Sequence, residues 1–277
     1  MLLRPFYPNV PARPAPQLRA AAEMPMTKRF ASILTAPLML LVLHGAAHAG
    51  DNIEERTWNT SAELGAISTS GNTSGTSVTG KIDARQELED WSNQYILTGF
   101  FKEDRNEDDD GHRQSVRSAE RFMLSAKAAY KLLDDGERLY VLGSHVDDKF
   151  GAYTRYSSVS VGRGKRLYKS SDKILEVELG PGYFNGVRAT GEEESGLTVR
   201  GAANVRWQIS PSALFTQTVA VERGTSNVHS VAETALSTKI NNTMQMKAAF
   251  SARSDSNVPV DKKNTDTQTS VTLVYSF

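Results

Sequence analysis

Residues 197–209, LTVRGAANVRWQI, show the clearest regular pattern of the chain. One set of alternate positions runs from Leu197 to Ile209 and is almost entirely apolar. The other set is largely polar and includes Arg200 and Arg206. Successive side chains of a β-strand point to opposite faces of the sheet. The stretch therefore predicts a strand with one apolar face and one charged face.

The same period of two recurs along the chain, most clearly in residues 76–87, 116–132 and 244–253. In a helix with 3.6 residues per turn, the charged residues of these segments would scatter around the cylinder. Alanine and lysine are frequent in 116–132 and favour a helix there, but alternation fits that segment better. A helical fold is therefore not expected.

Counting segments of this kind gives about twelve strands. Connections of three to five residues alternate with connections that are mostly longer, such as 104–115 and 185–195. Short periplasmic turns and longer outer loops are typical of transmembrane barrels. We predict an all-β fold, a transmembrane antiparallel up-and-down β-barrel over residues 58–277. The expected strands are 58–68, 74–87, 91–103, 116–132, 138–148, 155–168, 173–184, 196–209, 213–223, 229–240, 244–254 and 266–277.

Residues 26–49 have the pattern of a secretory signal peptide. They combine a basic start, an apolar run at 33–43 that is too short to span a bilayer, and a small-residue ending at Ala49. We expect cleavage near Ala49, with 1–25 an over-extended or non-native segment and 50–57 a short periplasmic lead-in. The alternative is an uncleaved N-terminal membrane anchor.

The composition narrows the class of protein. The 277 residues include 32 Lys+Arg, 32 Asp+Glu and no cysteine. A net charge of zero argues against a nucleic-acid partner, which needs a surplus of cations. Without cysteine there are no disulfides, thiolate metal sites or cysteine nucleophiles. An exported chain without disulfides suits a closed barrel in lipid, so we expect the outer membrane of a Gram-negative bacterium.

Aromatic residues gather near the strand ends assigned to the short-turn side. Amphipathic rings favour the headgroup level of a membrane, so we expect a girdle there. Its predicted members are Trp58, Trp91, Tyr130, Tyr140, Tyr168, Trp207, Phe215 and Tyr275. The last strand alternates to its end at Phe277, which resembles the signal read by the barrel-assembly machinery. We therefore expect this machinery and periplasmic chaperones as partners during biogenesis.

Short motifs add a family resemblance over residues 57–277. They are Glu63-Leu64-Gly65 with Ser70-Gly71-Asn72-Thr73, Asp148-Lys149-Phe150-Gly151, Leu179-Gly180-Pro181-Gly182-Tyr183, and the terminal strand. With them the chain resembles the salt-induced outer-membrane proteins, an uncharacterised YdiY-like β-barrel family defined by a domain of unknown function. The resemblance implies a fold and a location, but no established substrate.

No enzyme constellation stands out among the 5 histidines. His145 and Asp147 share a strand face without a placed nucleophile, and His229 and Ser230 point to opposite faces. The acidic stretch 103–110 lacks the downstream bidentate glutamate of a calcium loop and indicates a solvated outer loop. We expect no enzymatic function, no cofactor and no metal site.

Function, if it lies in the barrel, is expected in the lumen, where predicted inward cations outnumber carboxylates. We predict a narrow channel with a basic lumen for small anionic solutes. A closed structural or loop-presenting barrel and a soluble periplasmic β-sandwich binding module are the alternatives. Outer-membrane lipid and lipopolysaccharide are the expected surroundings. The candidate lumen residues are Lys81, Arg85, Arg117, Arg121, Lys127, Glu176, Glu178, Arg200, Arg206, Glu222, Lys247 and Arg253.

Overall fold

The computed structural model describes residues 57–69, 74–107, 113–132, 136–258 and 263–277. The predicted signal peptide and almost all of the predicted lead-in fall outside these residues. Within the described part of the chain, no helix is long and apolar enough to cross a membrane.

Twelve strands account for nearly all described residues, and the twelve predicted segments are confirmed to within a few residues at each end. Their bounds are β1 Trp58–Thr69, β2 Ser74–Glu87, β3 Trp91–Glu107, β4 Arg113–Lys131, β5 Glu137–Asp148, β6 Tyr153–Lys169, β7 Lys173–Arg188, β8 Glu193–Ser210, β9 Ala213–Arg223, β10 Val228–Lys239, β11 Met244–Asp255 and β12 Thr265–Ser276.

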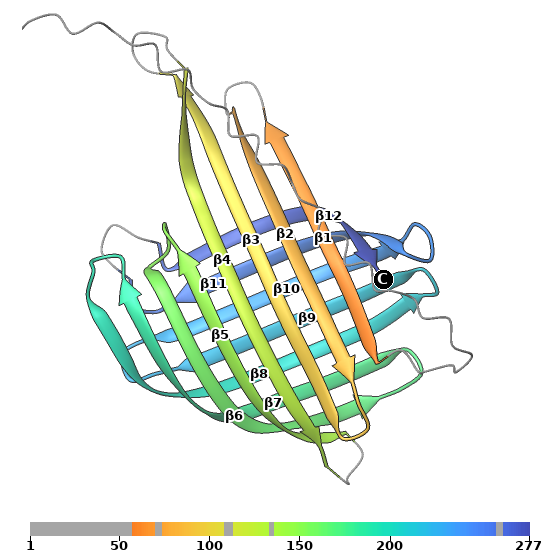
Figure 1. Cartoon of the computed structure of the whole chain (residues 1–277). Coiled ribbons are helices and arrows are strands. Elements are labelled where there is room, and N and C mark those ends of the chain that lie inside the picture. The colour runs from red at the N-terminus through yellow and green to blue at the C-terminus, as the bar shows by residue number, and fades with distance from the viewer. Residues whose placement is uncertain (1–56, 70–73, 108–112, 133–135, 259–262) are drawn as a thin grey trace, which may run out of the picture. The chain divides into compact units, whose positions relative to one another are not determined.

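The strands form one closed antiparallel barrel. Each strand pairs with its neighbours in sequence, and β1 pairs with β12 to close the ring. In Figure 1 the wall formed by β1–β5 crosses the wall formed by β8–β12 steeply, as expected for the tilted strands of a barrel. The predicted barrel is therefore confirmed, and the β-sandwich alternative is wrong because all strands belong to one sheet.

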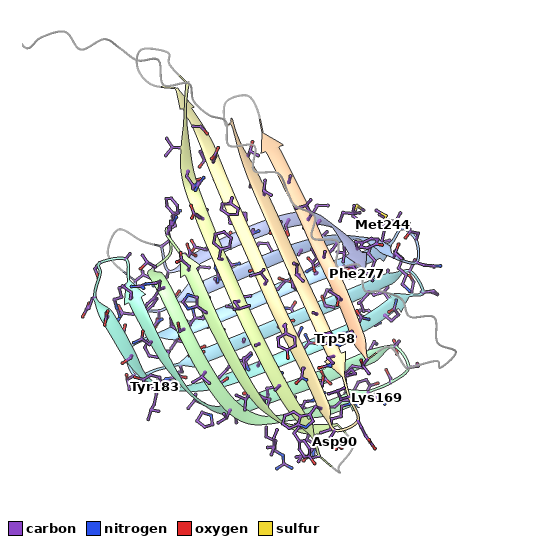
Figure 2. All side chains as sticks on the ribbon, viewed as in Figure 1. Trp58, Asp90, Lys169, Tyr183, Met244 and Phe277 are labelled. Atoms are coloured by element: carbon purple, nitrogen blue, oxygen red, sulfur yellow. The ribbon has the colours of Figure 1, made fainter. Side chains whose placement is uncertain are left out.

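The outside of the barrel is apolar. Residues that are paired across neighbouring strands have their side chains on the same face of the sheet. Leu64 and its partner Gly80 therefore lie on one face, and Ile82 lies there with Leu97 and Leu124; this face is the outer surface. Leu64, Ile82, Leu97 and Leu124 are all exposed, at 47–58%. Large exposed apolar side chains continue around the remaining strands (the side chains are drawn in Figure 2). An apolar exterior around a closed sheet is the architecture of a transmembrane β-barrel.

Aromatic rings mark the short-turn end of this exterior, with one exception. Trp58, Trp91, Tyr130, Tyr168, Trp207 and Tyr275 are exposed on the outside. Phe215 pairs with Trp207, and their ring centroids lie 6.4 Å apart. Tyr140 is the exception, because it lies on the inner face of β5 and is 2% exposed. The prediction that Tyr140 belongs to the girdle is wrong.

The outer loops are shorter than the sequence predicts, because the strands extend into the predicted loop residues. β3 reaches Glu107 and β4 starts at Arg113, so this hairpin runs beyond its neighbours (Figure 1). β7 and β8 continue to Arg188 and Glu193, and the turn between them uses Gly191 at φ +85°. Glycine adopts this left-handed conformation without steric cost. Part of the predicted acidic loop 103–110 is therefore strand.

A bulge changes the face of one predicted lumen residue. The β3–β4 register shifts between Lys102 and Glu103, so Glu103 pairs with Arg117 on the outward face. The Arg117 guanidinium lies 5.9 Å from the ring centroid of Phe101, which is also outward. The prediction that Arg117 lines the lumen is therefore wrong, because the extra residue reverses the alternation beyond it.

The cations Arg163 and Lys165 also lie outside, on the same face as Val159 and Val161. They stand at the short-turn end of β6 and are exposed, and both pair with Glu137, which is 7% exposed. Charged residues cost little on a barrel exterior near the membrane interface. Arg163 and Lys165 thus mark where β6 leaves the apolar band.

Glycines bring β6 and β7 unusually close. The pairing of these strands is interrupted between Ser160–Gly182 and Arg163–Leu179, next to Pro181, which has no N–H to donate. A Cβ on Gly180 would clash with the Val161 carbonyl oxygen and the Gly162 Cα atom. The Tyr140 hydroxyl lies over Gly162, 2.8 Å from where a Cβ would stand. Glycine here makes room for the buried ring of Tyr140.

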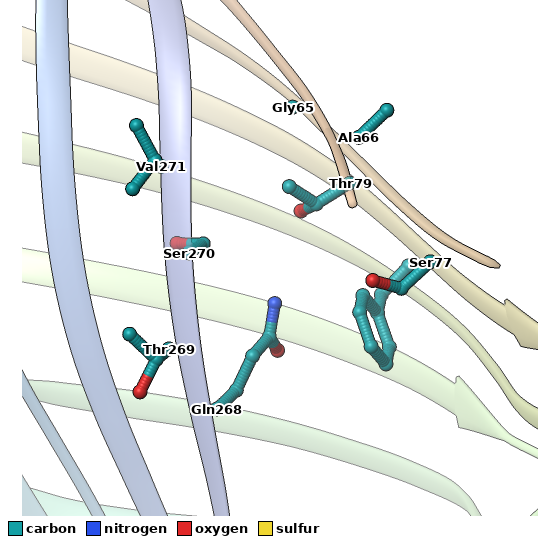
Figure 3. Close-up of a pocket in the computed structure, with 9 residues that line it drawn as sticks. Gly65, Ala66, Ser77, Thr79, Gln268, Thr269, Ser270 and Val271 are labelled. Atoms are coloured by element: carbon teal, nitrogen blue, oxygen red, sulfur yellow. The ribbon is translucent and has the colours of Figure 1, made fainter. Parts of the chain in front are cut away.

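The seam between β1 and β12 is the shortest pairing of the barrel. It runs from Ser61–Ser276 to Leu64–Leu273, extended by backbone hydrogen bonds between Thr60 and Phe277. Toward the outer end the two strands separate around a recess between residues 65–66 of β1 and 268–271 of β12 (Figure 3). Its volume of about 10 Å³ holds at most a water molecule, so it is not a solute site.

Candidate lumen site

The inner face of the barrel carries most of the charged residues that alternation assigns to it. Register places eleven of the twelve candidates inward, on the face opposite the exposed apolar residues. They are Lys81, Arg85, Arg121, Lys127, Glu176, Glu178, Arg200, Arg206, Glu222, Lys247 and Arg253. Whether they line a conduction path remains a prediction.

Sequence reasoning missed several inward charges, and most of them are near strand ends. They are Glu63, Arg138, Asp148, Arg166, Arg188, Glu194 and Asp255. Their alternation could have found Glu63 and Arg138, whereas Arg188 and Glu194 stand in a stretch that the sequence assigns to a loop. With these residues included, inward carboxylates and cations are closer to balance than the sequence predicts.

The largest charge cluster lies over Tyr140. Glu178 on β7 pairs with Lys127 on β4 and accepts a hydrogen bond from Arg200 Nη1 on β8 at 3.2 Å. Lys127 Nζ lies 5.1 Å from the Tyr140 ring centroid, and the Arg200 guanidinium carbon lies 6.0 Å from it. The three charged side chains are 15–20% exposed. This arrangement ties together strands that are not neighbours in the sheet.

A second cluster lies on the opposite wall. Lys247 on β11 pairs with Glu233 Oε1 at 3.0 Å and Glu63 Oε2 at 3.3 Å. Glu63 also lies 3.8 Å from Lys81, which in turn lies 3.8 Å from Asp83. Both clusters alternate in sign rather than forming a ring of one sign. Fixed opposite charges of this kind narrow a lumen and hold its side chains in place.

Aromatic rings and polar groups meet at the outer end. Tyr156 on β6 stacks on Phe184 and on His229 of β10, with centroids 5.5 Å apart in both pairs. Its hydroxyl donates a hydrogen bond to Glu222 at 2.9 Å. His229 Nδ1 lies 2.9 Å from Asp255 Oδ1. This group, Tyr156 with Phe184, His229, Glu222 and Asp255, is called the outer cluster below.

Hydrogen bonds also link the outer loops to one another and to the strands at the outer end of the barrel. Arg188 Nη1 on β7 donates to the amide oxygen of Asn257, which follows β11, at 3.4 Å. The Asn227 amide donates to Asp255 at 2.8 Å, and its oxygen accepts from the Asn257 backbone N–H at 3.0 Å. The connection after β11 therefore contacts both β7 and the β9–β10 turn.

Two inward arginines differ from the others. Within the described residues, neither Arg206 nor Arg253 has a carboxylate within 4.0 Å. Arg253 interacts at longer range with Asp148 and Asp266. Asp148 is closer to Arg121, whose Nε lies 3.6 Å from it. Among the described inward arginines, these two are therefore the ones without a close ion-pair partner.

The described histidines and carboxylates are predicted to form neither a metal site nor a catalytic pair with a placed nucleophile, and their positions are as follows. Among the described residues, no group of three or more His, Asp and Glu side chains is placed to hold a metal ion. His145 and Asp147 face outward, and His145 Nδ1 lies 2.8 Å from Ser157 Oγ. Within the described chain no carboxylate lies within 4.0 Å of His145, so the pair lacks the orienting group of a catalytic triad.

Comparison with known proteins assigns the chain to a protein family. A family model described as "Protein of unknown function, DUF481" matches residues 62–277. The chain belongs to the DUF481 family. The resemblance predicted from the short motifs is thereby confirmed. A DUF481-like relative, the uncharacterized protein YdiY of Escherichia coli (strain K12), is 25% identical over 162 residues. The match covers 58% of this chain and 64% of YdiY, less than two thirds of the relative's length.

Solved structures similar to this DUF481 barrel share little sequence with it. An outer membrane channel from Pseudomonas putida F1 has a TM-score of 0.48 at 8% identity, covering 79% of this chain and 94% of its own. The NanC porin has a TM-score of 0.47 at 6% identity, covering 79% and 97%. The translocator domain of autotransporter NalP from Neisseria meningitidis has 0.43 at 14%, covering 79% and 87%. Likeness at this level transfers no function to the DUF481 barrel.

Proposed function

We propose that this DUF481 protein is a narrow outer-membrane channel for small anionic solutes. The observation that carries the proposal is the pair of inward arginines, Arg206 and Arg253, that have no carboxylate within 4.0 Å among the described residues. Most other inward cations have an ion-pair partner. A guanidinium without a close carboxylate partner attracts anions and repels cations.

The ion-pair clusters set the expected size limit. Side chains of Lys127, Glu178 and Arg200 project from one wall, and those of Lys247 and Glu63 project from the other. Because these charges hold one another in place, large solutes are excluded while water and small ions have polar walls to pass. A barrel of twelve strands lies between small barrels filled by side chains and wide porins.

The closed structural barrel is the second candidate, and the outer cluster favours it. Tyr156 stacks on His229 across several strands, and Arg188 reaches Asn257 near the same end. If these contacts persist, they obstruct the path from the outer side. The two candidates therefore differ in whether the outer cluster leaves a passage.

Single-channel recording with the refolded barrel separates the candidates. We expect small discrete current steps for the native protein and steps about twofold larger for Tyr156→Ala, because the ring narrows the path. Tyr168→Ala, which removes an exposed ring on the outside, is the matched control and should conduct like the native protein. No current from well-folded native protein and from Tyr156→Ala would refute the channel and support the closed barrel.

The proposed outer-membrane location also implies partners that assemble the barrel. Phe277 closes the seam, since its N–H donates to the Thr60 carbonyl at 3.0 Å and its own carbonyl accepts from the Thr60 N–H at 3.3 Å. We infer that this terminal residue serves recognition by the barrel-assembly machinery, after escort by periplasmic chaperones. Phospholipid and lipopolysaccharide would then surround the apolar exterior.

A further inference from the structure

A notch lies on the barrel exterior where β8 extends beyond β9. Residues 193–198 of β8 pair with β7 but with no residue of β9, because the β8–β9 pairing stops at Val199–Arg223. The turn after β9 lies beside this free edge, since the Thr225 hydroxyl oxygen is 3.8 Å from where a Cβ on Gly196 would stand. The notch is a cavity of about 270 Å³, lined by Leu197, Thr198, Val199, Arg223, Gly224 and Thr225. Unlike the recess at the seam, it has room for part of a ligand.

One side of this notch is apolar and strongly exposed. Leu197 is 75% exposed, more than any other large apolar side chain of the described residues, and Val199 is 57% exposed. Both face outward, because they pair with Tyr183 and Pro181 on the outer face of β7. Tyr183, labelled in Figure 2, is also exposed. An apolar surface of this kind on a barrel exterior is suited to the acyl chain of a lipid.

The other side of the notch is cationic. Arg223 is the last residue of β9, faces outward with Val199 and is exposed. Within the described residues, no carboxylate lies within 4.0 Å of its side chain. The one outward carboxylate of β8, Glu193, stands four residues beyond Leu197, about 13 Å along the strand. The Arg223 guanidinium is therefore available to an anionic group, which it can bind through paired hydrogen bonds.

The notch lies at the outer end of the barrel wall. The aromatic pair of Trp207 and Phe215 marks the short-turn end of the same two strands, so Arg223 stands at the opposite end. Cations on a barrel exterior are tolerated near the membrane interface, where lipid headgroups lie. In a Gram-negative outer membrane, the outer leaflet is built of lipopolysaccharide, whose lipid anchor is a phosphorylated sugar bearing acyl chains.

We propose that this notch binds lipopolysaccharide, with Arg223 on a phosphate of the sugar headgroup and an acyl chain along Leu197 and Val199. The Thr225 hydroxyl and the β8 edge that has no β9 partner supply further hydrogen-bonding groups to the headgroup. The site is on the exterior, so it does not depend on conduction through the lumen.

Native mass spectrometry of the folded barrel in a non-ionic detergent, with added lipid A, tests the site; lipid A is the phosphorylated anchor of lipopolysaccharide. We expect a 1:1 complex whose dissociation constant rises about tenfold in Arg223→Gln, which loses a charged hydrogen-bond donor. Leu197→Ser should raise it about threefold or more, because apolar contact area is lost. Lipid A without its phosphates should bind the native barrel and Arg223→Gln equally, because the phosphate is the group that Arg223 contacts.

Arg155→Gln separates a built site from a general attraction between cations and anionic lipid. Arg155 also faces outward, on β6 beside Asp147, but lines no part of the notch. Its removal should weaken lipid A binding less than about twofold. An equal loss in Arg155→Gln and Arg223→Gln, or native affinity in Arg223→Gln, would overturn the site. Equal affinity of the native barrel for lipid A and phosphatidylglycerol would overturn the assignment to lipopolysaccharide. Channel recordings decide the anion channel separately from either result.

Discussion

Replacing Gly180 with alanine should prevent formation of the barrel. A Cβ at this position would clash with backbone atoms of Val161 and Gly162, and backbone cannot move away as a flexible side chain does. Overpacking of this kind costs about 3 kcal/mol. The clash also lies where the β6–β7 pairing is already interrupted, so any further separation would disrupt the few hydrogen bonds that hold these strands together there.

The altered mobility of unheated barrel on denaturing gels measures this effect after refolding into detergent. We expect little or no fast-migrating folded form of Gly180→Ala. Gly143→Ala is the matched control, because a Cβ at this strand glycine has no atom within 4 Å. The close approach of β6 and β7 would be refuted if Gly180→Ala folded and resisted urea as well as Gly143→Ala.

Replacing Glu178 with glutamine should give the second large effect. The change leaves Lys127 and Arg200 facing each other without the carboxylate that both contact. Breaking a largely buried pair by removing one partner costs about 3 kcal/mol, because the remaining charges are uncompensated. We expect a corresponding loss in the free energy of unfolding, measured by urea titration in lipid vesicles.

Glu87→Gln provides the comparison for Glu178→Gln. Glu87 pairs with Lys131 at 3.2 Å, and both side chains are well exposed, so its removal should cost at most about 1 kcal/mol. Adding Lys127→Met to Glu178→Gln removes one of the two stranded cations and should recover part of the lost stability. Equal stability of Glu178→Gln and Glu87→Gln would show that the cluster over Tyr140 does not hold the barrel together.

The sequence predicts the strands well because alternation is a local property. Period two assigns each residue to a face without knowledge of any partner strand, which is why eleven of the twelve candidates lie inward. Arg117 is misplaced because a bulge between Lys102 and Glu103 shifts the register, and no local pattern reveals it. Tyr140 is misplaced because nearness to a strand end does not fix the face: it alternates with the exposed Leu139 and Val141, and its hydroxyl lies over Gly162 inside the barrel.

The ion pairs could not be predicted from the sequence for a related reason. Lys127 and Glu178 are 51 residues apart in the sequence, and Lys247 and Glu63 are 184 residues apart. Such contacts depend on the register of every strand between the partners. If the register between two strands were shifted, different charged residues would pair. Counting inward cations in the sequence therefore does not reveal which of them lack an ion-pair partner.

The reversal potential of single channels in a potassium chloride gradient tests the proposed anion channel. The proposed channel should prefer chloride to potassium by about threefold or more, because Arg206 and Arg253 leave positive charge in the lumen. The preference should fall in the Arg206→Gln/Arg253→Gln double variant and persist in Arg223→Gln. A reversal potential at zero, or one of the sign that indicates potassium preference, would show that the lumen does not select anions.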